Sequence, residues 1–173
     1  MVTRRQFLKA GVVGGVTLAA VGSWYWHRHH GAGRSGDGYG LDAEGHAVVA
    51  ALAPVLLRGA LPEPPRQDAA IEAVVAGVDQ AIMGLSAAAR KEVMQLFALL
   101  AFAPTRMLVA GVSEPWSSAT RGEIEAFLEG WRFSRFQLLQ TGYAALHDLV
   151  LGAWYGNPAS WAAIDYPGPP EIF

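Results

Sequence analysis

The residues in this sequence that could do chemistry are few, and none of them is a cysteine. Without cysteine the chain can form no disulfide, no thiolate metal site, no thiol nucleophile and no thioether bond to a c-type haem. Three of its five histidines stand together in His27-Arg28-His29-His30. This cluster could ligate a metal, but the glycines that follow it are typical of a solvated linker, which is the interpretation we favour. The other two histidines, His46 and His147, are too few for most histidine-rich sites, so we predict no metal ion.

Neighbouring acidic residues also suggest chemistry. His147 precedes Asp148, which could be a general base beside an acid, but adjacent helical residues point about 100° apart. We therefore expect no hydrogen-bonded dyad and interpret His147 as a packed or surface residue. Glu123, Glu125 and Glu129 resemble a carboxylate cluster for acid–base work. Because they lie in the first turns of a predicted helix, where negative charge is stabilised, a solvated face is the better interpretation.

Two arginines and several aromatic residues form a further group. Arg132 and Arg135 lie about one helical turn apart, next to Trp131, Phe133 and Phe136. Such a group could contact nucleic acid, but the chain after residue 34 carries eight basic residues against fifteen acidic ones, a net charge of −7. This charge argues against a nucleic-acid partner. Since arginine and aromatic residues are enriched at protein interfaces, the group is either an interface or ordinary surface.

The net negative charge of the chain after residue 34 contrasts with the N-terminal segment, in which every charged residue is basic. Residues 1–34 contain five basic residues and no acidic one. The basic start is followed by an uncharged stretch over 10–26, which is the layout of an export signal. Residues 3–9 resemble the twin-arginine (Tat) signal, S/T-R-R-x-F-L-K, at every specified position, and the match is carried chiefly by Arg4, Arg5, Phe7, Leu8 and Lys9. Such a signal implies that its cargo folds, often around a cofactor, before it crosses the membrane.

Two fates of this signal, residues 1–30, stay open. Ala20-Val21-Gly22 offers small residues to a signal peptidase, which favours cleavage. Trp24-Tyr25-Trp26 could instead lie at a membrane interface, where aromatic residues gather, and the signal would then be retained as an anchor. Residues 31–41 are glycine-rich and predict a linker to a domain over 42–173.

The domain shows a helical period and no alternating stretch long enough for a strand, which predicts an all-α fold, a small single-domain helical bundle. Its first helix starts after Asp42 and is kinked or split at Pro54, because proline removes a backbone donor. The second helix covers 68–84, and the third starts after Ser86. A short helix over 105–110 follows the third.

The longest helical segment comes last. Thr120 and Glu123 form a capping-box pattern that opens it, and it ends near Trp154. Gly130 and Gly142 are expected to bend it.

The residues after this segment differ in kind. Trp154-Tyr155-Gly156-Asn157-Pro158 ends the helix in a turn, and 161–170 are dense in aromatic residues and prolines. This predicts an irregular Pro/aromatic-rich C-terminal tail. Because proline limits chain entropy and aromatic rings supply large contact areas, the tail could dock on its own domain or on a partner.

The two ends of the chain together carry a family resemblance. A twin-arginine leader precedes a small helical domain, which closes with the Trp-Tyr-Gly-Asn-Pro turn and an Ile-x-Tyr-x-Gly-Pro-Pro tail from Ile164 to Pro170. This resembles the small (gamma) subunit of membrane-associated FAD-dependent dehydrogenases of the glucose-methanol-choline type. Gluconate 2-dehydrogenase subunit 3 and the small subunits of sorbitol and fructose dehydrogenases belong to that family. Residues 149–170 carry most of the likeness, and the middle matches mainly in its helix pattern.

The resemblance implies an accessory role. In that family the small subunit is not an enzyme and holds no cofactor. It binds a large FAD-containing dehydrogenase subunit, helps it mature and carries it through the Tat translocase to the periplasm, where the complex is membrane-associated. A multihaem cytochrome c subunit often accepts the electrons. We therefore expect no catalytic, cofactor-binding or metal-binding residue in this chain, and we expect partner contacts from Trp131, Arg132, Arg135, Trp154, Tyr155, Trp161, Tyr166, Pro169 and Pro170.

A function from a different class also stays open. The chain could be a stand-alone Tat-exported helical enzyme or ligand-binding protein of the periplasm, with a pocket lined by His46, His147 or the pair Arg132 and Arg135. A third alternative is a signal-anchored protein that holds a complex at the membrane.

Overall fold

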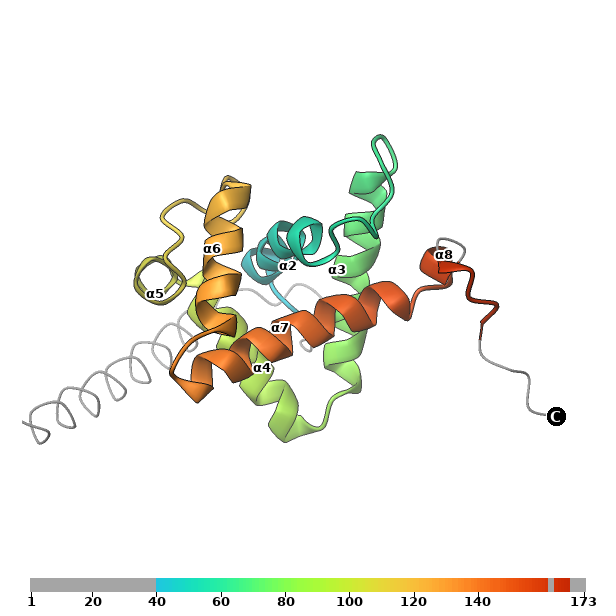
Figure 1. The fold of residues 1–173 in the computed structure, drawn as a ribbon. Coiled ribbons are helices and arrows are strands. Elements are labelled where there is room, and N and C mark those ends of the chain that lie inside the picture. Colours follow the sequence, from blue (N-terminus) through green and yellow to red (C-terminus); the bar gives the residue numbers. More distant parts are fainter. Residues whose placement is uncertain (1–39, 162–163, 169–173) are drawn as a thin grey trace, which may run out of the picture. The chain divides into compact units, whose positions relative to one another are not determined.

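The computed structural model describes residues 40–161 and 164–168, and over these residues it contains helices and no strand, which confirms the all-α prediction (Figure 1). The described residues belong to one compact unit that starts at Tyr39. The predicted signal and nearly all of the predicted linker lie outside the described residues, as do Pro169 and Pro170. The helices are α2 (Ala43–Leu56), α3 (Gln67–Gly84), α4 (Ala87–Ala101), α5 (Ala103–Thr105), the π-helix η1 (Arg106–Ala110), α6 (Arg121–Arg132), α7 (Gln137–Tyr155) and α8 (Pro158–Trp161).

Helix α2 is the central element, since it packs against α3, α4, α6 and α7. It begins as predicted, because the Asp42 side chain accepts a hydrogen bond from the Gly45 amide at 2.9 Å. The predicted split at Pro54 is wrong, because the helix continues to Leu56. Pro54 lies in the last turn of the helix. It removes one backbone N–H donor, but only two helical residues follow it.

Helices α3 and α7 pack against each other and supply much of the core. On each helix the buried side chains recur every four residues, which is the spacing of one helical face. They are Val74, Val78 and Ile82 on α3, and Leu146, Val150 and Trp154 on α7.

The short helix predicted over 105–110 is present, but most of it is the π-helix η1. Two side chains tie this segment to its surroundings. The Thr105 hydroxyl donates to the carbonyls of Leu99 and Phe102. The buried Arg106 guanidinium donates to the carbonyls of Val112 and Ser113 at 3.3 and 3.2 Å. These bonds fix a wide turn that backbone propensity alone would not select.

The long helix predicted from Thr120 to Trp154 is instead two helices, α6 and α7, broken at residues 133–136. Ser134 stabilises the break. Its hydroxyl accepts a hydrogen bond from the Phe136 amide at 3.1 Å, and its carbonyl accepts one from the Gln140 side chain at 2.7 Å. A serine hydroxyl that binds a nearby backbone amide competes with helix formation in this way.

Gly142, where a bend was expected, lies inside α7 and serves packing between the two helices. A Cβ atom at Gly142 would lie 2.6 Å from Cζ3 of Trp131 on α6, which is closer than real Cβ contacts come. The absence of a side chain therefore lets α7 approach the indole. Gly130 lies within α6, and the space around it is open.

The C-terminal tail contains a helical turn, α8, and then folds back on itself. The Trp161 indole donates to the Tyr155 carbonyl at 2.8 Å, and its ring meets Tyr166 edge-on with centroids 5.4 Å apart. Helix α8 also packs against α7. The described part of the tail is thus partly docked on its own chain.

Candidate functional site

The structure divides the expected partner-binding residues into buried and exposed groups. Trp131 and Trp154 belong to the core, with 4% and 5% of their surfaces exposed. The Trp131 indole donates to the Val109 carbonyl at 2.9 Å, so its polar atom is also satisfied within the domain. These two tryptophans hold the domain together and are not part of its outer surface.

Figure 1 shows where α6 turns into α7, and Arg132 and Arg135 are exposed in this turn. We call this surface the α6–α7 turn patch, and it consists of Arg132, Phe133, Arg135, Phe136 and Leu138. The exposed fractions of Phe133, Phe136 and Leu138 are 75%, 51% and 81%. The guanidinium of Arg132 lies 5.2 Å from the Phe133 ring centroid, and that of Arg135 lies 4.9 Å from the Phe136 centroid. Basic and aromatic groups are therefore interleaved at one end of the domain.

A second exposed group follows α7. Tyr155 and Tyr166 are exposed, whereas Trp161 between them is partly buried. Because Trp161 bonds to the Tyr155 carbonyl and packs on Tyr166, the three residues form one aromatic cluster, which we call the tail cluster. The structure thus brings these three predicted residues together.

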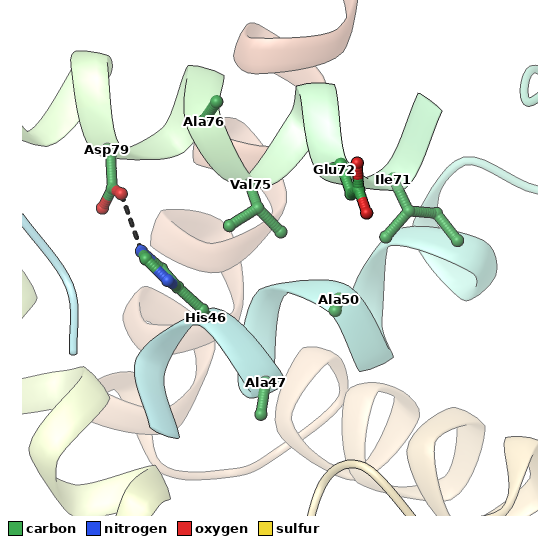
Figure 2. Close-up of a pocket in the computed structure, with 8 residues that line it drawn as sticks. All are labelled: His46, Ala47, Ala50, Ile71, Glu72, Val75, Ala76 and Asp79. Carbon is green, nitrogen blue, oxygen red and sulfur yellow. Dashed lines mark hydrogen bonds and ion pairs between the residues drawn. The ribbon is translucent and has the colours of Figure 1, made fainter. Parts of the chain in front are cut away.

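His46 lines an open groove between α2 and α3, and Figure 2 shows its side chain pointing across to Asp79. The His46 Nε2 atom lies 2.7 Å from Oδ2 of Asp79, and Oδ1 of Asp79 accepts a hydrogen bond from the Leu41 amide at 2.9 Å. Sequence reasoning missed Asp79, because a single aspartate on an amphipathic helix looks like a solvent-facing residue. The remaining lining is Ala47, Ala50, Ile71, Glu72, Val75 and Ala76.

The groove offers little chemistry. Its volume is about 380 Å³, its walls are mostly apolar, and its histidine and aspartate are bonded to each other. Of the residues offered as alternatives for a pocket, His46 lines this groove, whereas His147, Arg132 and Arg135 are not among its lining residues. The His46–Asp79 pair fixes the start of the domain to α3.

His147 forms the contact with Asp148 that we did not expect. Nδ1 of His147 lies 3.1 Å from Oδ1 of Asp148, so the prediction that the neighbours cannot pair is wrong. Although their Cβ atoms diverge, rotation about the side-chain bonds brings the terminal atoms together. Asp148 remains 79% exposed, and His147 also packs against the Tyr143 ring at 5.6 Å. The pair lies on the helix surface.

The carboxylates of α6 serve the fold. The predicted capping box is formed, since Thr120 Oγ1 accepts from the Glu123 amide and the Glu123 carboxylate accepts from the Thr120 amide at 2.9 Å. The Thr120 amide, followed by the hydroxyls of Thr120 and Ser113, lowers the pKa of Glu123 from 4.5 to about 2. Glu125 pairs with Arg58 and Arg121, which links α6 to the end of α2.

We expect Glu123→Gln to destabilise the domain in a pH-dependent way. The pKa of Glu123 is lower in the folded state than in the unfolded state, so its contribution is complete above about pH 4.5 and is lost as the pH falls toward 2. The difference in urea midpoint between wild type and variant, measured by circular dichroism, should be widest near pH 6 and vanish near pH 2. Glu129→Gln in the same helix is the control. A difference that stays constant over this range would contradict the assignment.

The described residues contain no group of three or more histidines and acidic residues that could hold a metal ion. No single helix over 40–161 is long and apolar enough to span a membrane; α4 and the segment Ala103–Ala110 would pass the length and composition test together, but they are bent by 81°. Comparison of the chain with protein-family models, with curated proteins and with solved structures gave no match.

Proposed function

We propose that this chain is a non-catalytic small subunit that binds a large FAD-containing dehydrogenase subunit, helps it mature and escorts it by Tat export to the periplasm. A multihaem cytochrome c subunit would accept the electrons, and the substrate would be bound by the large subunit. The observation that carries the proposal is the complete twin-arginine pattern of residues 3–9 ahead of a helical domain whose tail resembles that of the small-subunit family.

The geometry of the domain supports a role through contact. Three of the ionisable groups singled out for chemistry have structural partners: Glu123 caps α6, Glu125 pairs with two arginines, and His46 pairs with Asp79. At the same time the tail cluster displays aromatic surface. Tyrosine and tryptophan supply large contact area with few rotatable bonds, which is why they dominate binding energy at interfaces. The tail cluster is therefore our choice for the contact with the flavin subunit.

One experiment tests binding and export together. The chain carries a C-terminal tag and an intact leader, and it is purified from its own cells as wild type and as the double variant Arg4→Lys, Arg5→Lys. We expect a flavin-containing protein to co-purify with the wild-type chain from the periplasmic fraction. The same flavin protein should co-purify with the variant from the cytoplasmic fraction. The twin arginines would direct export of the complex, whereas other surfaces would hold the two subunits together. Lys9→Arg keeps the charge of the leader and is the control for expression.

Two results would overturn the proposal. If the double variant still delivers the flavin protein to the periplasm at the wild-type level, the chain does not provide the export signal. If the wild-type chain purifies alone, without flavin absorbance, and binds or converts a small molecule, it belongs to the stand-alone class of periplasmic proteins instead.

A further inference from the structure

The α6–α7 turn patch has a charge distribution unlike the rest of the domain. Between Glu129 and Asp148 the chain contains Arg132 and Arg135 and no acidic residue, although the chain as a whole carries fifteen acidic residues against thirteen basic ones. Neither arginine forms a salt bridge with any residue that the structure describes. Their contacts are with aromatic rings, including Tyr143 at 5.9 Å from Arg132. The patch therefore presents two cationic groups without a neutralising partner.

The apolar part of the patch is exposed to an unusual degree. Phe133 and Leu138, the most exposed apolar residues of the patch, have 75% and 81% of their surfaces open to solvent. The neighbouring segment η1 adds Met107 and Leu108, which are 55% and 83% exposed, and the bond from Trp131 to the Val109 carbonyl holds η1 against the end of α6. Exposed apolar residues that gather at one end of a domain mark an interaction site, whereas scattered ones do not.

The backbone that carries the patch is held in place. Trp131 is fixed in the core directly before the patch, and Ser134 bonds to the Phe136 amide and the Gln140 side chain within it. Binding would therefore order few groups that are not already ordered, which lowers its entropic cost.

We propose that the α6–α7 turn patch docks on the surface of a lipid bilayer that contains anionic phospholipids. Guanidinium groups bind phosphate oxygens in a two-pronged geometry, and basic residues near an anionic leaflet are attracted to its negative surface potential. The Phe133 and Phe136 rings and Leu138 would enter the boundary between headgroups and acyl chains, as the apolar faces of interfacial segments do. The inference rests on these residues and not on the export proposal.

The test uses the full chain and vesicles of defined composition, either pure phosphatidylcholine or phosphatidylcholine with phosphatidylglycerol. Hydrogen–deuterium exchange followed by mass spectrometry gives a readout for each segment, so that binding by the leader cannot be mistaken for binding by the patch. We expect protection of the peptide over 130–140 with the phosphatidylglycerol vesicles, much less with phosphatidylcholine, and a loss of protection as the salt concentration rises. The peptide over 80–90 is the internal control.

Matched variants separate charge from apolar contact. Arg132→Gln with Arg135→Gln should weaken vesicle binding of the patch about thirtyfold, since each basic residue contributes roughly a factor of five at an anionic surface. Arg66→Gln with Lys91→Gln removes the same charge outside the patch, and this variant should change vesicle binding of the patch little. Phe133→Ser with Leu138→Ser should weaken binding to both vesicle types, whereas Met83→Ser, an exposed residue on α3, should not.

The proposal fails if residues 130–140 gain no protection while the chain is bound to phosphatidylglycerol vesicles. It also fails if these residues are protected only by a co-purified protein partner and never by vesicles, because the patch would then be a protein interface. Equal weakening by the two double charge variants would show a general charge effect and would equally overturn it. None of these results bears on export by the leader.

Discussion

Replacing Trp116 with alanine should cost the domain about 3–5 kcal/mol of unfolding free energy, the range for truncating a large buried aromatic side chain. Trp116 is 2% exposed and lies in the loop between η1 and α6. Its indole donates to the Leu100 carbonyl at 2.9 Å, and its ring meets Phe127 edge-on with centroids 5.6 Å apart. One residue thus joins the end of α4 to α6. Since small domains are stable by only about 5–15 kcal/mol, this loss is a large share of the total stability.

Urea unfolding followed by far-ultraviolet circular dichroism measures this effect without depending on tryptophan emission. Trp116→Phe is the matched variant, because it keeps an aromatic ring in the core but leaves the Leu100 carbonyl without its donor, a loss of about 1–3 kcal/mol. Phe133→Ala, at a surface position with 75% exposure, should change stability by less than about 0.5 kcal/mol. A Trp116→Ala domain as stable as the Phe133→Ala domain would contradict the role assigned to this residue.

The second large effect concerns two glycines in the same helix. Gly142→Ala places a methyl group 2.6 Å from the Trp131 ring, and that ring is held by its bond to the Val109 carbonyl and by the Phe127 ring, 4.8 Å away between centroids. The ring cannot withdraw without disturbing both contacts, so α6 and α7 must separate. We expect a loss of about 1–3 kcal/mol, the usual cost of overpacking a core.

Gly152→Ala is the control, with the opposite sign. Nothing lies within 4 Å of a Cβ at Gly152, which is also inside α7. Alanine should therefore raise stability by roughly 0.5–1 kcal/mol through its better helix propensity. The test compares the thermal unfolding midpoints of the two single variants with that of the wild type. If both substitutions shift the midpoint upward, the close approach between Gly142 and Trp131 does not exist in solution.

Most of the helices could be predicted because their ends have local causes. Asp42, Ser86 and the Thr120–Glu123 pair each cap the helix that they were expected to cap. The break between α6 and α7 could not be predicted in the same way. The apolar period continues to Leu138, and only the bonds of Ser134 and the packing of Gly142 against Trp131 show that the chain must turn.

The candidate surfaces were harder to predict than the fold. In the sequence, Trp131 and Trp154 cannot be distinguished by residue type from the aromatic residues that turn out to be exposed. Only the tertiary packing shows that these two belong to the core. The reverse holds for Leu138, whose helical spacing is typical of a core residue although it is exposed. Asp79 had no local motif at all, because its partners Leu41 and His46 lie 38 and 33 residues away in the chain.

The attachment of Leu41 has a mechanical consequence. The Leu41 amide is bonded to Asp79 in the C-terminal third of α3, and the Leu41 side chain is 8% exposed within the core. A pulling force applied to the preceding residues would therefore reach α2 and α3 together, near the centre of the domain. A load that enters there is shared among the packed helices and does not peel them away one by one.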